Sequence, residues 1–190
     1  TGVTTLQFDL EAKRLELFKE AIPTLRQVAV LVNPDSAAMR EGLKQLEIAG
    51  EKLGVRLRSF ELRREPAALQ TVFAAILRER PDGLVVVADS LAATHSARIG
   101  EFATRNRLPA MAGFRALVAD GCLISYGGDY TEGWRIAARY VDKILKGAKP
   151  AELPVEQPTK FHLAISLKTA KALGLTIAPA LLLRADQVIE

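Results

Sequence analysis

Four short segments of the chain could hold a small ligand, because each follows a short apolar run and leads into a helical pattern. They cover residues 33–36, 89–90, 113–115 and 126–130. In open parallel sheets, ligands bind outside the carboxyl ends of the strands. At the start of a helix, free backbone N–H groups and the positive end of the helix dipole can receive a carboxylate or another anion. These segments therefore predict a ligand site at one edge of a sheet.

The polar residues of these segments also have a structural interpretation as helix caps. Asp89 or Ser90 could cap one helix and Asp129 another, since Asp and Ser are favoured N-cap residues. Asp129 with Glu132 fits the spacing of a capping box. Any fold of this kind shows polar caps at this edge, so both interpretations stay open from the residues alone.

The chain lacks the motifs of common nucleotide-binding and catalytic sites. Gly127 and Gly128 are followed by neither the third glycine of a dinucleotide fingerprint nor the Gly-Lys-Ser/Thr of a P-loop. There is no serine elbow and no His-x-Glu metal motif, and His95 and His162 are expected to have structural roles. The single Cys122 excludes an intrachain disulfide and a cysteine metal cluster, and its apolar neighbours predict a buried, inert thiol. We expect a binding protein with no metal, no cofactor and no enzymatic activity.

Composition and charge narrow the range of partners. The net charge of +4 comes from basic residues scattered over separate elements, so there is no basic stripe that would predict nucleic-acid binding. No apolar run approaches the roughly 20 residues of a membrane span. With 190 residues, 49% of them hydrophobic and 6% aromatic, the chain can bury a core built mostly from aliphatic side chains.

Short apolar runs alternate with amphipathic helical patterns along most of the chain. The predicted strands lie at about residues 28–32, 55–62, 83–88, 109–114 and 121–126, and a first helix at about 9–22 precedes them. Arginines interleave the run at 55–62, which favours the edge of a sheet. This order predicts an α/β fold with a doubly wound parallel sheet and right-handed crossovers.

The pattern changes near residue 147, after a last helix whose apolar face includes Trp134, which we expect in the core. Residues 148–160 contain three prolines at intervals of four, which forbid a helix and favour an extended path. From Phe161 the alternation of a strand resumes. We therefore expect an α/β ligand-binding lobe at 1–147, an extended arm at 148–160 that crosses to another body, and a tail at 161–190 that belongs to that body.

Long motifs in the last third of the chain point to a family. Residues 140–150 read Tyr-Val-Asp-Lys-Ile-Leu-Lys-Gly-Ala-Lys-Pro, residues 153–161 read Leu-Pro-Val-Glu-Gln-Pro-Thr-Lys-Phe, and residues 167–175 read Leu-Lys-Thr-Ala-Lys-Ala-Leu-Gly-Leu. Shorter motifs at 1–3, 12–17 and 28–34 extend the match over nearly the whole chain. Together they resemble the substrate-binding proteins of a bacterial ABC importer family, which has a type I periplasmic-binding-protein fold and includes tryptophan-binding members.

The resemblance implies two α/β lobes joined by a hinge, with the ligand trapped between them. The chain would begin where the family crosses from the first lobe to the second, so a first lobe and a signal sequence would precede it. The arm at 148–160 would be the return crossing, and the tail at 161–190 would complete the first lobe. An unpaired strand in that tail would favour self-association through residues 155–190.

The resemblance also implies a function and a set of contact residues. By their positions at the strand ends, the residues lining the site would be Asn33, Asp89, Ser90, Phe114, Tyr126 and Asp129. Asp89 and Asp129 could meet a ligand ammonium, and Phe114 or Tyr126 could meet an apolar or aromatic side chain. The implied protein captures an amino-acid-like or aromatic solute by hinge closure, docks on an ABC permease in the membrane, and is periplasmic or anchored at the cell surface.

Two other functions stay open from the sequence. A ligand-sensing domain of a signalling or regulatory protein would have the same fold. A flavodoxin-like enzyme or nucleotide binder would share the doubly wound sheet, although the missing phosphate-loop and catalytic motifs count against it.

Overall fold

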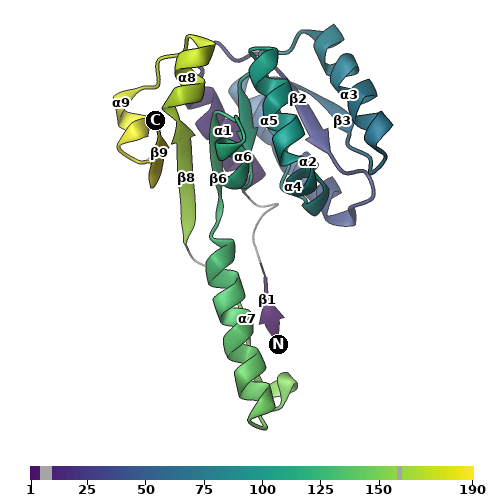
Figure 1. Ribbon diagram of the computed structural model, residues 1–190, viewed down its shortest axis with the longest axis vertical. Coiled ribbons are helices and arrows are strands. Elements are labelled where there is room, and N and C mark those ends of the chain that lie inside the picture. Colours follow the sequence, from purple (N-terminus) through teal and green to yellow (C-terminus); the bar gives the residue numbers. More distant parts are fainter. Residues whose placement is uncertain (5–9, 158–159) are drawn as a thin grey trace.

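The computed structural model describes residues 1–4, 10–157 and 160–190 (Figure 1). The strands are β1 (Gly2–Val3), β2 (Gln27–Val32), β3 (Arg56–Glu61), β4 (Gly83–Val86), β5 (Ala110–Ala112), β6 (Ile124–Gly128), β7 (Val155–Glu156), β8 (Phe161–Ser166) and β9 (Gln187–Ile189). The helices are α1 (Glu11–Ala21), α2 (Ala37–Leu53), α3 (Pro66–Glu79), α4 (Ser90–Thr94), α5 (Ser96–Arg105), α6 (Ala116–Ala119), α7 (Tyr130–Leu145), the 3-10 helix η1 (Pro150–Glu152), α8 (Leu167–Leu173) and α9 (Pro179–Leu182). The predicted start of the first helix at residue 9 lies outside the described residues, as do residues 158–159 of the predicted arm.

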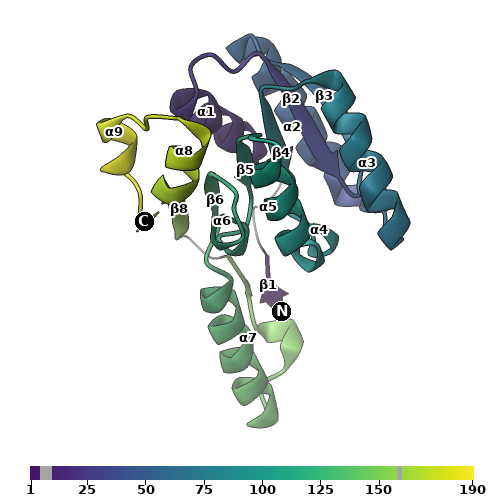
Figure 2. The same cartoon turned by 45° about the horizontal axis from the view of Figure 1, so that its top comes forward.

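Seven strands form one sheet in the order β3-β2-β4-β5-β6-β8-β9. Neighbouring strands run parallel except for β6 and β8, which are antiparallel. Helices α1 and α2 cover one face, and α3 and α5 cover the other (Figure 2). The predicted α/β fold with a doubly wound parallel sheet is therefore confirmed for β2 to β6. Strand β3 lies at the edge that its arginines predicted.

The central strands are buried on both faces, which explains why they read as continuous apolar runs. Along β2, Val28 and Val30 pack into the cluster under α1 and α2, whereas Ala29 and Leu31 pack into the cluster under α3 and α5. Side chains alternate sides along a strand, so a strand covered on both faces needs apolar residues at every position. Cys122 belongs to the second cluster, and burial raises the pKa of its thiol to about 12, so the predicted buried thiol is confirmed.

The tail at 161–190 belongs to the sheet of this lobe, so its predicted place in another body is wrong. Strand β8 pairs antiparallel with β6 and β9 pairs parallel with β8. Leu163 and Ile165, which alternate along β8, are buried in the cluster under α1 and α2. Without β8, β6 would be an open edge of the sheet. Because β8 is paired on both sides, the unpaired strand from which we predicted self-association through residues 155–190 is not there, and that prediction loses its basis.

A different part of the chain leaves the sheet. Helix α7 runs away from it with β1 alongside (Figure 1), and β1 pairs in parallel with β7. We call residues 1–4 and 129–157 the projecting part, and residues 10–128 and 160–190 the body. The predicted boundary near residue 147 is wrong, because the chain leaves the body at Asp129, where the Asp129 N–H donates to the Lys160 carbonyl of the returning segment at 3.4 Å.

The projecting part exposes large apolar side chains. Trp134 is 73% exposed and Leu145 is 82% exposed, so the prediction that Trp134 lies in the core is wrong. On α7 only Ile136 and Tyr140 are buried. The helix is amphipathic as predicted, but its apolar face does not pack into either core cluster of the body.

Candidate ligand-binding site

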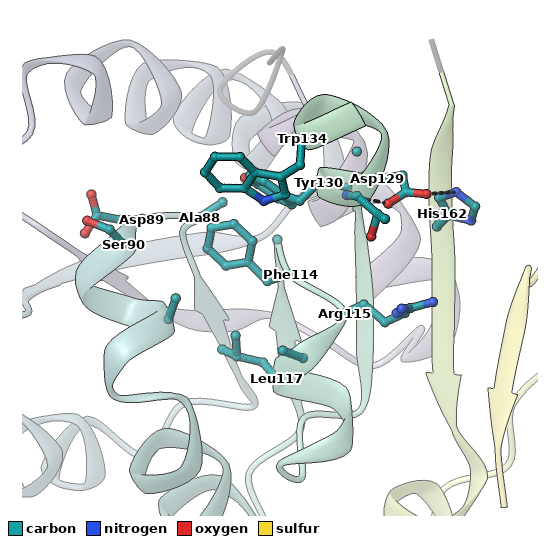
Figure 3. Close-up of a pocket in the computed structure, with 16 residues that line it drawn as sticks. Ala88, Asp89, Ser90, Phe114, Arg115, Leu117, Asp129, Tyr130, Trp134 and His162 are labelled. Atoms are coloured by element: carbon teal, nitrogen blue, oxygen red, sulfur yellow. Dashed lines mark hydrogen bonds and ion pairs between the residues drawn. The ribbon is translucent and has the colours of Figure 1, made fainter. Parts of the chain in front are cut away.

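A pocket of about 620 Å³ lies where the carboxyl ends of β4, β5 and β6 meet the start of α7 (Figure 3). It is lined by residues 88–90 and 93 after β4, 113–117 after β5, 127–131 from the end of β6 onward, Trp134 on α7 and His162 on β8. Three of the four predicted segments therefore converge on one site. The segment at 33–36 does not line it.

Asp89 lies on the wall of the pocket and also caps a helix. Its Oδ1 accepts from the Leu91 N–H at 2.8 Å, at the start of α4, and from the side-chain amide of Asn33 at 3.0 Å. Asn33 is buried, and its Oδ1 accepts from the Asp35 N–H at 3.0 Å. Asn33 therefore supports Asp89 from behind, contrary to its predicted place on the wall, whereas Ser90 lines the pocket beside Asp89.

Asp129 caps the start of α7 and lies close to His162. Its Oδ1 accepts from the Thr131 N–H at 2.8 Å, so the predicted helix cap is confirmed. Its Oδ2 lies 3.8 Å from Nε2 of His162 (Figure 3). Burial raises the pKa of Asp129, but the hydrogen bonds from Thr131 and Glu132 and the neighbouring His162 outweigh that effect, so the pKa lies below its usual value. Asp129 is therefore ionised at neutral pH.

Aromatic rings form another wall of the pocket. The ring centroids of Phe114 and Tyr130 are 5.1 Å apart, and Trp134 lines the same pocket (Figure 3). Burial raises the pKa of Tyr130 to about 12, with Arg14 acting in the opposite direction, so the hydroxyl stays protonated at neutral pH. Tyr126 does not line the pocket, contrary to its predicted role, and its ring lies 6.1 Å from that of Phe161.

The predicted residues that meet at the pocket are Asp89, Ser90, Phe114 and Asp129. Residues that the prediction missed are Arg115, Tyr130, Trp134 and His162. Arg115 and Tyr130 stood in predicted segments, and Trp134 follows Tyr130 at the i, i+4 spacing of one helix face. His162 was expected to be only structural, because its strand had been assigned to another body.

The wall offers charge and apolar contact to a ligand. The carboxylates of Asp89 and Asp129 could bind a cation, Arg115 could bind an anion, and the rings could contact a flat apolar group. Within the described residues, no group of three or more His, Cys, Asp or Glu side chains is arranged to hold a metal ion. None of the helices in the described part of the chain is both long and apolar enough to span a membrane.

The α/β fold with its mostly parallel seven-stranded sheet is of the periplasmic-binding-protein type, and comparison with known proteins agrees. The family model described as "ABC transporter substrate binding protein" matches residues 1–189. The chain therefore belongs to the ABC transporter substrate-binding protein family, and the resemblance seen in its sequence is confirmed. A search of curated proteins found no match to the chain.

Several solved structures are similar to the chain. A conserved domain protein from Vibrio cholerae O1 biovar El Tor strain N16961 has a TM-score of 0.88 and 28% identity, over 99% of this chain and 62% of that one. An ABC domain from Streptococcus pneumoniae in complex with L-Trp has a TM-score of 0.84 and 23% identity, over 94% and 62%. The ligand-free, open structure of a substrate-binding protein with adhesive properties from Clostridium difficile has a TM-score of 0.67 and 21% identity, over 93% and 59%. The chain thus spans 59–62% of the length of these structures.

Proposed function

We propose that this chain works in a solute-binding protein of an ABC importer and captures an amino-acid-like or aromatic solute without changing it chemically. The observation that carries the proposal is the pocket, where an ionised carboxylate and aromatic rings meet at the edge at which parallel sheets bind ligands. Membership of the substrate-binding family supports the importer role.

The polar group of the solute would be an ammonium bound to Asp129. Oδ1 of Asp129 is used by the Thr131 N–H, while Oδ2 lies on the side of His162. A hydrogen bond between an ammonium and an ionised carboxylate is roughly twice as strong as a neutral one. The lowered pKa of Asp129 keeps this carboxylate charged through the neutral range.

The apolar group of the solute would lie among the rings of Phe114, Tyr130 and Trp134. Aromatic side chains bury large areas and prefer offset or edge-to-face contact with another ring. The neighbour from Streptococcus pneumoniae holds L-Trp in the same fold, which supports an aromatic amino acid as the first solute to test.

A second lobe would close the site. The chain spans 62% of the length of its Vibrio cholerae neighbour, and the projecting part carries exposed apolar side chains that such a lobe would cover. The solute would bridge the two lobes and stabilise the closed state by its higher affinity for that state. The closed protein would dock on a membrane permease, from the periplasm or from the outer cell surface.

The other two functions considered from the sequence have less support. A regulatory sensing domain shares the fold, but the family that matches is one of transport proteins. A nucleotide-binding site typically has a glycine-rich loop that cradles the negatively charged phosphate. This pocket instead has the carboxylates of Asp89 and Asp129 on its wall, which would repel phosphate.

Calorimetry on the protein as expressed from its natural gene tests the proposal. We expect L-tryptophan or L-phenylalanine to bind at least about 100-fold more tightly than L-alanine, because each ring adds contact worth ~2.7 kcal/mol or more. Tightest binding of a sugar, or equal affinity for L-alanine, would contradict the solute class. Mass spectrometry of small molecules released on denaturation would then identify the solute directly.

A further inference from the structure

Two charged residues lie buried beneath the pocket. Glu11 and Arg14, on the first turn of α1, are both 0% exposed. Arg14 Nη1 donates to Oε1 of Glu11, and Arg14 Nε donates to the Tyr126 carbonyl at 2.7 Å. Burying such a pair carries a desolvation cost that two apolar side chains of similar size would avoid. Stability alone is therefore a weak explanation for the pair.

The pair meets the ends of the strands that carry the pocket. Tyr126 lies in β6, just before the residues that enter the pocket wall. The pKa of Glu11 lies above its usual value, because the effect of burial exceeds the opposite effects of the Arg14 charge and hydrogen bond and of the Ala88 backbone. Ala88 follows β4 and lines the pocket. The hydrogen bond of the pair to the sheet is thus made at the end of β6, which lies next to β5.

Two glycines leave room for the guanidinium at the ends of β5 and β6. A Cβ on Gly113 would lie 3.0 Å from Cζ of Arg14 and 2.4 Å from Cβ of Ala88. A Cβ on Gly127 would lie 3.5 Å from Nη2 of Arg14 and 2.2 Å from the Gly113 carbonyl oxygen. Both glycines line the pocket. The guanidinium therefore lies against the inner side of the pocket wall, at the ends of β5 and β6.

We propose that the buried Glu11–Arg14 pair positions the ligand pocket, by holding the carboxyl ends of β5 and β6 at the spacing that ligand binding requires. The proposal rests on the proposed function, since it concerns the same site. Apolar packing is non-directional, whereas the planar guanidinium fixes the direction of each hydrogen bond that it donates. Arg14 anchors the carbonyl of Tyr126 three residues before Asp129, where the chain leaves for α7.

The field of Arg14 also reaches the wall. The charge of Arg14 acts to lower the pKa of Tyr130, although the larger effect of burial raises that pKa overall. Tyr130 lines the pocket beside Phe114. The pair is therefore close enough to the ligand site for its loss to change binding as well as the geometry of the strand ends.

The test replaces both charges at once, in the protein as expressed from its natural gene. The double variant Glu11→Met/Arg14→Met keeps apolar bulk, and replacing a buried ion pair by apolar residues is often neutral for stability. We expect its melting temperature to stay near that of the parent. Its affinity for L-tryptophan should fall at least about tenfold, a change of ~1.4 kcal/mol. Amide hydrogen exchange should become faster at residues 113–117 and 127–131.

A matched control comes from the other end of the same helix. Phe18 on α1 is fully buried. Its ring packs against the start of β4, since a Cβ on Gly83 would lie 2.7 Å from it. Phe18→Leu should lower the melting temperature but leave the affinity for L-tryptophan and the exchange at the pocket segments unchanged. If the ion pair has only a structural role, a stable double variant should match the parent in its affinity for L-tryptophan and in its exchange at the pocket segments. That result would overturn the proposal.

Two further measurements keep the outcome clear. If the double variant does not fold, Arg14→Lys is used, which keeps the charge but not the planar set of donors. Faster exchange at residues 126–129 in that variant supports positioning, and parent-like exchange overturns it. If the parent does not bind L-tryptophan, the proposed solute class fails, while the exchange data still decide whether Glu11 and Arg14 hold the strand ends.

Discussion

The body and the projecting part both contain amphipathic elements, but the apolar faces are buried in the body and exposed in the projecting part. In the body, β8 buries Ile165 completely, and the apolar residues of α1 and α2 pack on the sheet. In the projecting part, α7 has a similar apolar stripe but leaves Trp134 and Leu145 exposed at 73% and 82%. An apolar face therefore indicates that an element packs against another surface, but that surface need not belong to the body.

The comparison also locates the site. The pocket lies where the body ends and the projecting part begins, so its wall combines Asp89 and Phe114 from the body with Asp129 and Trp134 from the projecting part. A ligand that touches both parts would resist their relative motion. Hinge proteins respond to ligands in this way, because contacts from both sides favour one arrangement over the other.

The largest expected effect is a difference in how much substitutions in the body and in the projecting part lower the free energy of unfolding. Ile165→Ala in β8 should lower the free energy of unfolding by about 2–5 kcal/mol, since it removes buried side-chain atoms from the core. Leu145→Ala at the exposed end of α7 should change it by no more than about 0.5 kcal/mol in the isolated chain. Denaturant unfolding of both variants gives the comparison. A small loss for Ile165→Ala would mean that β8 is not part of the body.

The sequence allowed the body to be predicted further than the projecting part. Runs such as Val28 to Val32 are apolar at every position, which is typical of a strand buried on both faces of a sheet. The alternation in β8 was recognised, but alternation specifies one covered face and not the sheet that the strand joins. The prolines after Gly147 were interpreted as leading away from the body, whereas the chain had already left it at Asp129.

The next effect concerns the need for both sides of the site. If a second lobe closes over the pocket, the 190-residue chain alone should bind the solute at least about 100-fold more weakly than the protein expressed from its natural gene, a difference of ~2.7 kcal/mol. Half of a two-lobe site loses the bridging contacts and much of the desolvation that supports affinity. Calorimetry on the two proteins decides the point, and equal affinities would show that the pocket described here is sufficient.

A smaller effect isolates the charge of Asp129 from its role as a cap. Asn caps a helix as well as Asp does, so Asp129→Asn should leave the melting temperature nearly unchanged. Loss of the charge should weaken binding of an ammonium ligand by ~1.5–3 kcal/mol. The control is Asp82→Asn, because Asp82 also accepts backbone hydrogen bonds, from Arg26 and Gln27 at 2.8 Å each, but does not line the pocket. Equal binding by both variants would remove Asp129 from the site.

The pH dependence of binding has a definite sign at the same residue. The pKa of Asp129 lies below its usual value, so the carboxylate stays charged until the pH falls through that lowered pKa. The contribution of Asp129 to affinity should therefore be constant through the neutral range and be lost in acid. Calorimetry of the parent and of Asp129→Asn across this range should show the two affinities converging as the pH falls. A constant gap between them would point to another cause.

Only part of the candidate site could be predicted from the sequence, and the reason is physical. Polar residues that follow apolar strands can be placed at one edge of a sheet from the sequence, which located Asp89, Phe114 and Asp129. The buried Arg14 had no such signal, because a charged residue on an amphipathic helix is usually exposed. His162 reached the pocket through the pairing of β8 with β6, a contact between distant parts of the chain that periodicity does not report.

The smallest expected effect tests whether an exposed ring serves the ligand. Trp134 is 73% exposed, so Trp134→Ala should change the free energy of unfolding of the isolated chain by no more than about 0.5 kcal/mol. An aromatic solute would lose a ring contact worth about 0.5–1.5 kcal/mol, and an aliphatic one should lose less. The matched control is Val141→Ala on the same helix, 57% exposed and away from the pocket, which should leave binding unchanged. Calorimetry with L-tryptophan and L-leucine gives the comparison. If Trp134→Ala and Val141→Ala bind both solutes alike, Trp134 is exposed only to be covered by another lobe, and the aromatic wall reduces to Phe114 and Tyr130.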